Sequence, residues 1–139
     1  MNYILQKNNH SVFLLTFHLI LVTKYRKKCI NKNINIRLKQ ISHDIIVQSY
    51  HGKILSIESE LDHIHILMQL KPPCHLSKLI NSLKSVSSRK IRSEFKDHLK
   101  NFFFNKPVFW SPSFCLLSSG GAPINIIKQY ISSQNSPKF

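Results

Sequence analysis

Two histidines separated by one apolar residue are the side chains of this sequence best suited to chemistry. His63-Ile64-His65 lies within residues 61–68, where polar and apolar residues alternate as they do in a β-strand. Successive side chains of a strand point to opposite faces, so Ile64 would face a core while both histidines share the other face. Neutral imidazole nitrogens bind divalent metal ions. The pair is therefore a candidate metal site, to which another segment must add a third ligand.

The C-terminal segment offers candidates for that ligand and for a nucleophile. Tyr130 and Gln134 are four residues apart in a predicted helix over 123–134, so they share one helix face. The amide oxygen of Gln134 would be a neutral third ligand, and Asp62 and Glu60 are alternatives. A metal held in this way would polarise a phosphate and neutralise the charge that develops on it.

The phenol of Tyr130 is the candidate nucleophile. A phenol is a weak nucleophile near neutral pH unless a metal or a basic neighbour such as Lys128 polarises it. Its attack on a phosphodiester would leave a phosphotyrosine bond that stores energy for rejoining, whereas a hydrolytic nuclease would use water. Plain structural roles are the alternative: Tyr130 would anchor its helix on the core, and the histidines would be ordinary surface residues.

The chain is strongly basic. Its 139 residues include 20 Lys and Arg against 6 Asp and Glu, a net charge of +14. A domain with this balance typically binds a polyanion, most often nucleic acid. The length predicts one domain over residues 1–139. We expect a cytoplasmic protein with no membrane span or secretory signal, whose three distant cysteines are reduced thiols.

Hydrophobic patterns predict four strands and three helices. The strands are expected over 11–23, 53–60, 63–70 and 108–119, and the helices over 34–50, 76–95 and 123–134. The order β-α-β-β-α-β-α indicates a ferredoxin-like, RRM-like α/β (α+β) sandwich, with a four-stranded antiparallel sheet and helices on one face. The histidines would lie on the open face. The core is expected within 11–119, followed by a C-terminal catalytic helix.

Two local expectations follow from the same patterns. Gly52 is expected to end the helix over 34–50. Strict alternation in the strand over 53–60 would place Ile54 and Ile57 on opposite faces of the sheet.

Basic residues mixed with aromatic ones predict contacts with nucleic acid. One group follows the first strand and comprises Lys24, Tyr25, Arg26, Lys27 and Lys28. A second group lies on the helix over 76–95 and comprises Lys84, Ser85, Ser88, Arg89 and Arg92. Rings of this kind stack on unpaired bases, while the cations contact phosphates. Lys100, Lys106 and Phe102–Phe104 are further candidates. Solvated charged faces, and phenylalanines in the core, are the alternatives.

These segments together resemble a known family. Thr23-Lys24-Tyr25-Arg26, Asp62-His63-Ile64-His65, Trp110-Ser111 and Tyr130-Ile131-x-x-Gln134 follow one another here. That order is similar to the single-tyrosine HUH transposases of the smallest bacterial insertion sequences, to which the REP-associated tyrosine transposases are related. The resemblance extends from about residue 10 to residue 134.

The resemblance implies a role for each matching residue. His63 and His65 would be the metal-binding pair, Gln134 the third ligand, and Tyr130 the nucleophile. The tyrosine would cleave single-stranded DNA through a 5′-phosphotyrosine intermediate and release a 3′-OH. The metal would be Mg²⁺, with Mn²⁺ able to replace it.

The resemblance also implies partners. The enzyme would recognise imperfect hairpins near the element ends and act as a homodimer, in which the tyrosine helix of one subunit can complete the metal site of the other. Gly120-Gly121 would be the flexible link before that helix. Cys115 and Leu116 depart from the family's usual aromatic and small residues, which leaves the geometry of helix exchange open. The protein would be prokaryotic, and associated with the nucleoid when bound to DNA.

Three other functions fit part of this pattern. A non-catalytic ferredoxin-like module that binds RNA would explain the charge, but it would carry exposed aromatics on its central strands. A domesticated relative would process hairpins for its host, and genomic context would distinguish it. A hydrolytic metal nuclease would not depend on Tyr130.

Overall fold

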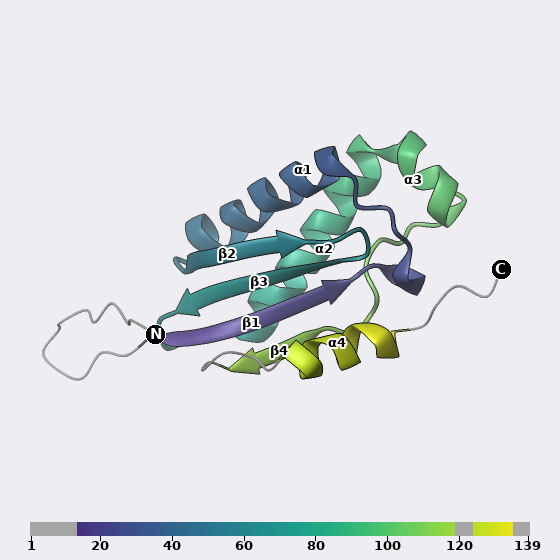
Figure 1. Ribbon diagram of the computed structural model, residues 1–139. Helices are drawn as coiled ribbons and strands as arrows, with labels where there is room; N and C mark the ends of the chain where they lie inside the picture. Colours follow the sequence, from purple (N-terminus) through teal and green to yellow (C-terminus); the bar gives the residue numbers. More distant parts are fainter. Residues whose placement is uncertain (1–13, 119–123, 135–139) are drawn as a thin grey trace, which may run out of the picture.

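The protein forms a four-stranded antiparallel sheet with helices packed on one face (Figure 1). The computed structural model describes residues 14–118 and 124–134. The strands are β1 (Leu15–Val22), β2 (Lys53–Ser59), β3 (His63–Leu70) and β4 (Cys115–Ser118), in the spatial order β2-β3-β1-β4. This topology confirms the predicted ferredoxin-like sandwich.

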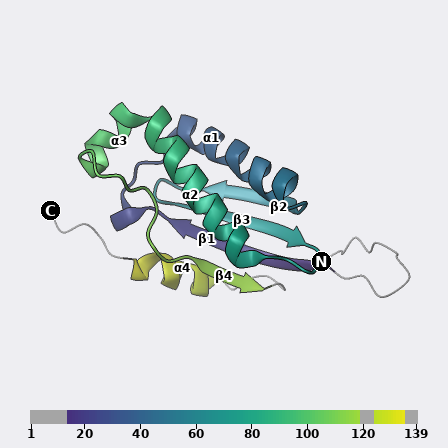
Figure 2. The same cartoon turned by 180° about the vertical axis from the view of Figure 1, so that it is seen from behind.

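Two long helices cover one face of the sheet, as the view from behind shows (Figure 2). They are α1 (Lys32–His43), whose first turn is capped by Asn31, and α2 (Leu76–Glu94). The last helix, α4 (Ile124–Ser133), lies beside β4 on the side of the sheet away from α2 (Figures 1 and 2). None of the described helices has the length and apolar character needed to cross a membrane.

The two central strands alternate as predicted. Ile64, Ile66 and Met68 of β3 lie in the core beneath the helices, together with Phe17 and Leu19 of β1. Burial of these apolar side chains is the main force that joins sheet and helices. Positions between them point to the opposite face, which therefore carries the histidines of β3.

The predicted alternation of β2 was wrong. Its pairing with β3 shifts between Ile54 and Ser56, which makes Leu55 an extra residue in the strand. Such a bulge changes the side-chain parity of a strand by one position. Ile54 and Ile57 consequently both pack against the core, while Leu55 remains exposed.

The end of the first helical segment also differs from the prediction. After α1 the chain continues as a π-helix, η2 (Asp44–Ser49), and His51 rather than Gly52 takes the left-handed conformation, with φ 58°. Gly52 serves a different purpose. A Cβ atom there would lie 2.5 Å from Cδ2 of Leu70 and close to the β3 backbone, so glycine permits this close approach.

The last predicted strand is much shorter than 108–119. Among the described residues of this segment, Cys115–Ser118 alone pairs with β1, and the preceding residues run irregularly apart from a bridge between Trp110 and Thr23. Pro112 has no N–H for a ladder and suits this irregular course. A short helix that the sequence did not predict, α3 (Lys96–Phe103), follows α2 directly.

Other expectations concern single residues or undescribed segments. Cys29, Cys74 and Cys115 are all unpaired thiols, as predicted. Residues 11–13 of the first predicted strand, residue 119 of the last, and the Gly120-Gly121 link lie outside the described residues.

Candidate active site

Three histidines, rather than two, lie on the open face of the sheet. β1 pairs with β3 so that Ile20 stands opposite His65 and His18 opposite Leu67. His18 is therefore the diagonal neighbour of His65, and its Nδ1 lies 2.9 Å from the His65 Nε2. Sequence reasoning missed His18, because the register of the two strands, which brings the rings together, is not visible in either strand alone.

The second imidazole, His63, is held by a carboxylate. Its Nδ1 lies 2.8 Å from Oδ1 of Asp62, a residue that is only 8% exposed. Asp62 also forms an ion pair with Arg26, whose Nε is 3.5 Å from Oδ2. A carboxylate on one ring nitrogen fixes the tautomer and leaves the other nitrogen for a metal. This contact gives Asp62 an orienting role, beside its predicted role as an alternative ligand.

The Thr23-Lys24-Tyr25-Arg26 motif is the turn that brings Arg26 to Asp62. The buried Thr23 donates from its hydroxyl to the Lys27 carbonyl at 2.7 Å, and from its N–H to the Asp62 carbonyl at 2.9 Å. Tyr25 and Arg26 have φ values of 58° and 54°, in the left-handed region that non-glycine residues rarely adopt. Strained residues of this kind are typical of functional sites.

The surroundings favour neutral imidazoles. Burial lowers the pKa of His65, and the nearby His18 and His63 lower it further, while Glu58 opposes the change. Burial also lowers the pKa of His18. Both rings are consequently uncharged near neutral pH, which is the form that coordinates a metal.

The face of α4 that carries Tyr130 is bound to the irregular segment before β4. The Tyr130 Oη lies 3.1 Å from the Ser113 Oγ. The amide oxygen of Gln134 accepts hydrogen bonds from Ser111 at 2.9 Å and from Ser113 at 3.2 Å. Burial raises the pKa of Tyr130; the Ser113 hydrogen bond opposes this, and Cys115 adds to it. Ser113 was not predicted, since a serine in an irregular segment has no distinctive sequence signal.

The hydrogen bonds of Tyr130 and Gln134 are made to the serines and not to the histidines. A cavity of about 460 Å³ beside His63 is lined from α4 by Lys128, Ile131 and Ser132, which belong to another side of the helix. No hydrogen bond within the described part of the chain joins Tyr130 or Gln134 to His63 or His65. The structure therefore presents two half-sites, both bordered by α4.

The donor atoms of the first half-site fit a divalent metal. No group of three His, Cys, Asp or Glu side chains within 14–118 and 124–134 is arranged to hold a metal ion. His63 and His65 supply two imidazoles on one face of β3, one of them oriented by Asp62. A third ligand from another segment, such as the amide oxygen of Gln134, would complete the usual donor set for a catalytic metal.

The first predicted DNA-binding group lies next to this half-site. The Nζ of Lys24 lies 5.2 Å from the centre of the Tyr25 ring, and the Nζ of Lys27 lies 6.0 Å from the centre of the Phe104 ring. Phe104 is 65% exposed with φ 51°, whereas Phe103 is buried. The structure thus separates the three phenylalanines at 102–104: one is in the core, one is partly buried, and Phe104 faces solvent beside the basic turn.

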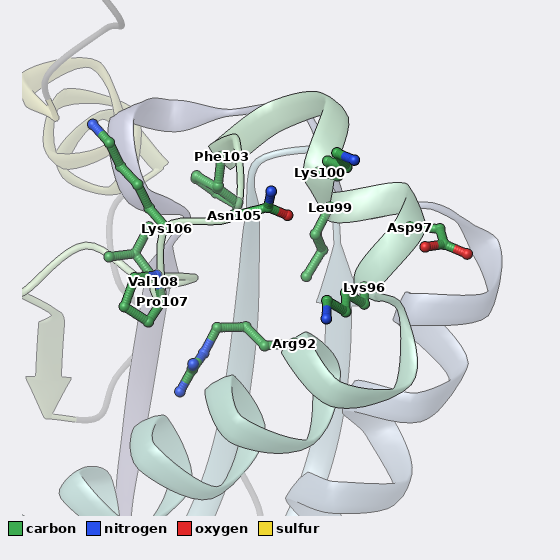
Figure 3. A pocket seen from close by; sticks show the side chains of 10 residues that line it. All are labelled: Arg92, Lys96, Asp97, Leu99, Lys100, Phe103, Asn105, Lys106, Pro107 and Val108. Atoms are coloured by element: carbon green, nitrogen blue, oxygen red, sulfur yellow. The ribbon is translucent and has the colours of Figure 1, made fainter.

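The second predicted group is divided by the structure. Arg89 and Ser85 are exposed on α2, and Ser88 accepts a hydrogen bond from Arg92 at 3.2 Å. Arg92 lines a cavity of about 450 Å³ together with Pro107 and Val108, and the other residues around this cavity include Lys96, Lys100 and Lys106 (Figure 3). Lys84 is bonded to backbone carbonyls of residues 111–113.

Residues 11–134 match the family model described as "Transposase IS200 like". The fold is thus that of a transposase. The chain belongs to this family of IS200-like transposases. It is 28% identical to the ISDra2 transposase TnpA of Deinococcus radiodurans over 131 residues, which are 94% of this chain and 91% of that protein.

Solved structures agree with this assignment. A crystal structure of a Deinococcus radiodurans protein designated as a transposase superposes with a TM-score of 0.82 at 30% identity, covering 95% of this chain and 99% of that one. A REP-associated tyrosine transposase bound to a REP hairpin superposes with a TM-score of 0.52 at 10% identity, covering 93% and 70% of the two chains. The second likeness concerns the fold alone.

The lowered pKa values of His18 and His65 predict that acid destabilises the fold. Below about pH 6.5 the unfolded chain binds protons at these positions before the folded chain does, so the free energy of unfolding falls as pH decreases. Urea unfolding between about pH 7.5 and pH 5 measures this slope. His18→Asn should flatten it, whereas His43→Asn, at an exposed position of α1, should not. An unchanged slope in His18→Asn would contradict the prediction.

Proposed function

We propose that this transposase cleaves and rejoins single-stranded DNA at hairpin-bearing element ends, with Tyr130 as the nucleophile. The observation that carries the proposal is the pair of half-sites at the His63 end of the sheet. One half-site has two metal-binding imidazoles, and the other has a tyrosine and an amide oxygen on one helix face. Because the chain belongs to a family of transposases, we interpret the two half-sites as parts of one DNA-cleaving site.

The proposed reaction is a transesterification. The Tyr130 oxygen forms a bond to the phosphorus while the bond from phosphorus to the 3′-oxygen breaks, which gives a 5′-phosphotyrosine and a free 3′-OH. The phenol proton leaves to solvent or a base, and the departing 3′-oxygen takes up a proton. The number of phosphoester bonds is conserved, so rejoining needs no nucleotide cofactor.

His63, His65 and Gln134 would hold the divalent metal, which we expect to be Mg²⁺, with Mn²⁺ as a substitute. Such an ion polarises the scissile phosphate and offsets its developing charge. The need for it is consistent with the surroundings of Tyr130, since burial raises the pKa of this phenol and makes it a poorer nucleophile without help.

The same geometry supports a shared site in a homodimer. Within one chain, Tyr130 and Gln134 face Ser111 and Ser113 rather than the histidines. The tyrosine helix of a second subunit would supply the missing groups to His63 and His65. Each metal site would then be completed by the partner.

The open face argues against a non-catalytic RNA-binding module. Such modules stack bases on aromatic side chains of their central strands. The open-face positions of β1 and β3 within the described residues hold no aromatic ring other than histidine, and Phe17 lies in the core on the other side. An exposed ring instead occurs at Phe104, beside the basic turn.

Tyr130→Phe should abolish the covalent adduct while DNA binding persists, because only the phenol oxygen is lost. The measurement incubates the protein with Mg²⁺ or Mn²⁺ and a labelled single-stranded oligonucleotide that carries the hairpin flanking its own gene, followed by a denaturing gel. Tyr25→Phe is the matched control and should keep the adduct. Cleavage by Tyr130→Phe would establish a hydrolytic nuclease instead.

His63→Ala should remove both cleavage and binding of Mn²⁺, since one imidazole ligand is lost. Calorimetric titration with Mn²⁺ measures the binding, and exposed His43→Ala provides the control. Unaltered Mn²⁺ affinity in His63→Ala would contradict the metal assignment.

The same variants test the shared site. An equal mixture of His63→Ala and Tyr130→Phe chains should regain adduct formation if the helix acts on the partner, because one mixed site has all its groups. A mixture as inactive as its components would place the helix on its own subunit.

Phe104→Ala should weaken binding of single-stranded DNA about 5- to 150-fold, the loss expected for one stacked base, without changing the salt dependence. Lys28→Ala should instead change the salt dependence, because a phosphate contact is lost: the slope of log affinity against log salt should fall by about 0.7. Fluorescence anisotropy at several salt concentrations measures both quantities. Phe104→Trp should retain the affinity, and equal affinity of Phe104→Ala and the wild type would exclude stacking at this ring.

A further inference from the structure

The irregular segment 111–113 is fixed more firmly than its lack of regular structure suggests. The Ser111 N–H donates to the Val22 carbonyl at 2.7 Å, which ties the segment to the end of β1. The preceding residue, Trp110, donates from its indole N–H to the Ser87 hydroxyl on α2 at 2.8 Å. The start of the segment is thus anchored to both layers of the fold.

Lys84 holds the rest of the segment. Its ammonium donates to the carbonyls of Ser111 at 2.8 Å, Pro112 at 2.9 Å and Ser113 at 3.3 Å. An ammonium has three N–H donors, and here each has a backbone acceptor. Burial lowers the pKa of Lys84, and the ring of Phe114 lies 5.8 Å from its nitrogen. This lysine is saturated by the protein itself and stiffens the segment by bridging three successive carbonyls.

The two serine hydroxyls of this segment face α4. Both donate to the amide oxygen of Gln134, which has two lone pairs and is therefore fully occupied. The Oγ of Ser113 also lies 3.1 Å from the Oη of Tyr130, and either hydroxyl can be the donor in this contact. The network fixes the orientation of both side chains of the helix.

We propose that Lys84, Ser111 and Ser113 form a serine seat that positions the tyrosine helix, with Ser113 as a positioning residue for Tyr130 and Gln134. The importance of those two side chains rests on the proposed function, whereas the seat itself rests on the hydrogen bonds. A consequence follows for the metal. On the seat, both lone pairs of the Gln134 oxygen are used, so at least one serine bond must open before this oxygen coordinates an ion.

Hydrogen exchange of the α4 amides tests the seat without any substrate. Ser111→Ala/Ser113→Ala and Lys84→Met should each speed exchange in Ile124–Ser133, by about 2- to 12-fold for each hydrogen bond lost. Amides of β1 and β3 should be unaffected. Lys78→Met, at an exposed position of the same helix as Lys84, is the matched control.

Unchanged exchange in α4 of the double serine variant would overturn the proposal. That variant removes only two oxygen atoms, so it remains decisive if Lys84→Met does not fold. Ser113→Thr keeps a hydroxyl and should exchange like the wild type. Rapid exchange in Ser113→Thr equal to that of Ser113→Ala would also contradict a role for the hydroxyl.

Covalent adduct formation then tests the link to function. Because a serine bond must open before Gln134 coordinates an ion, Ser113→Ala should form the adduct faster than the wild type at saturating oligonucleotide, with unchanged affinity for DNA, and Ser113→Thr should return the rate to that of the wild type. Equal rates in the wild type and Ser113→Ala would refute the positioning role. A wild-type protein that forms no adduct would refute the proposed function, and the exchange experiment would still decide on the seat.

Discussion

The antiparallel pairing of β1 with β3 is the constraint on which both the core and the candidate site depend. Eight residue pairs run from Leu15–Leu70 to Val22–His63. Because side chains alternate along each strand, this register places the apolar set of both strands beneath the helices and leaves His18 and His65 on the same open face. A slip by one residue would move the histidines into the core, so the hydrophobic burial that stabilises the fold also fixes the site.

Residues at the end of this pairing connect the sheet to the turn before His63 and to the irregular segment before β4. Thr23 continues β1 and binds the Asp62 carbonyl, while Asp62 orients His63. The Ser111 N–H binds the last carbonyl of β1, at Val22. The half-site with the histidines and the segment that contacts the tyrosine helix are therefore attached to the sheet within two residues of each other. Backbone hydrogen bonds to buried groups make this end of the sheet rigid, since leaving them unpaired is costly.

The sequence predicted the features that depend on local pattern. Alternation identified β3, and the positions of Ile64 and His65 on opposite faces are as expected. Prediction from the sequence failed where the geometry depends on pairing between segments that are distant in the chain. The bulge at Leu55 is a property of two strands, and the meeting of His18 with His65 depends on register.

Contacts made by single polar side chains could not be predicted from the sequence either. The sequence placed Lys84 among residues that contact DNA, because a lysine on a helix face looks the same whether it binds phosphate or carbonyls. Its three carbonyl acceptors come from a segment 27 to 29 residues away, and only the folded chain brings them together. By contrast, Tyr130 lies in α4 and Gln134 directly follows its last residue, Ser133, so the four-residue spacing was enough to predict that both side chains lie on the same side.

The few acidic residues of the chain are unevenly distributed. A protein with a net charge of +14 repels cations in general, so a divalent ion needs a local source of negative potential. Three of the six acidic residues lie close to the histidines of β3: Glu58 pairs with His65 from the end of β2, and Glu60 and Asp62 lie in the turn before His63. Interactions between charges weaken with distance and with salt, so this cluster acts chiefly on the histidines beside it. The remaining surface has only three acidic residues against the 20 Lys and Arg of the chain, as binding of a polyanion would require. Binding of DNA and binding of a metal, which the proposed function requires together and which would conflict on a uniformly basic surface, could therefore occupy adjacent parts of one small domain.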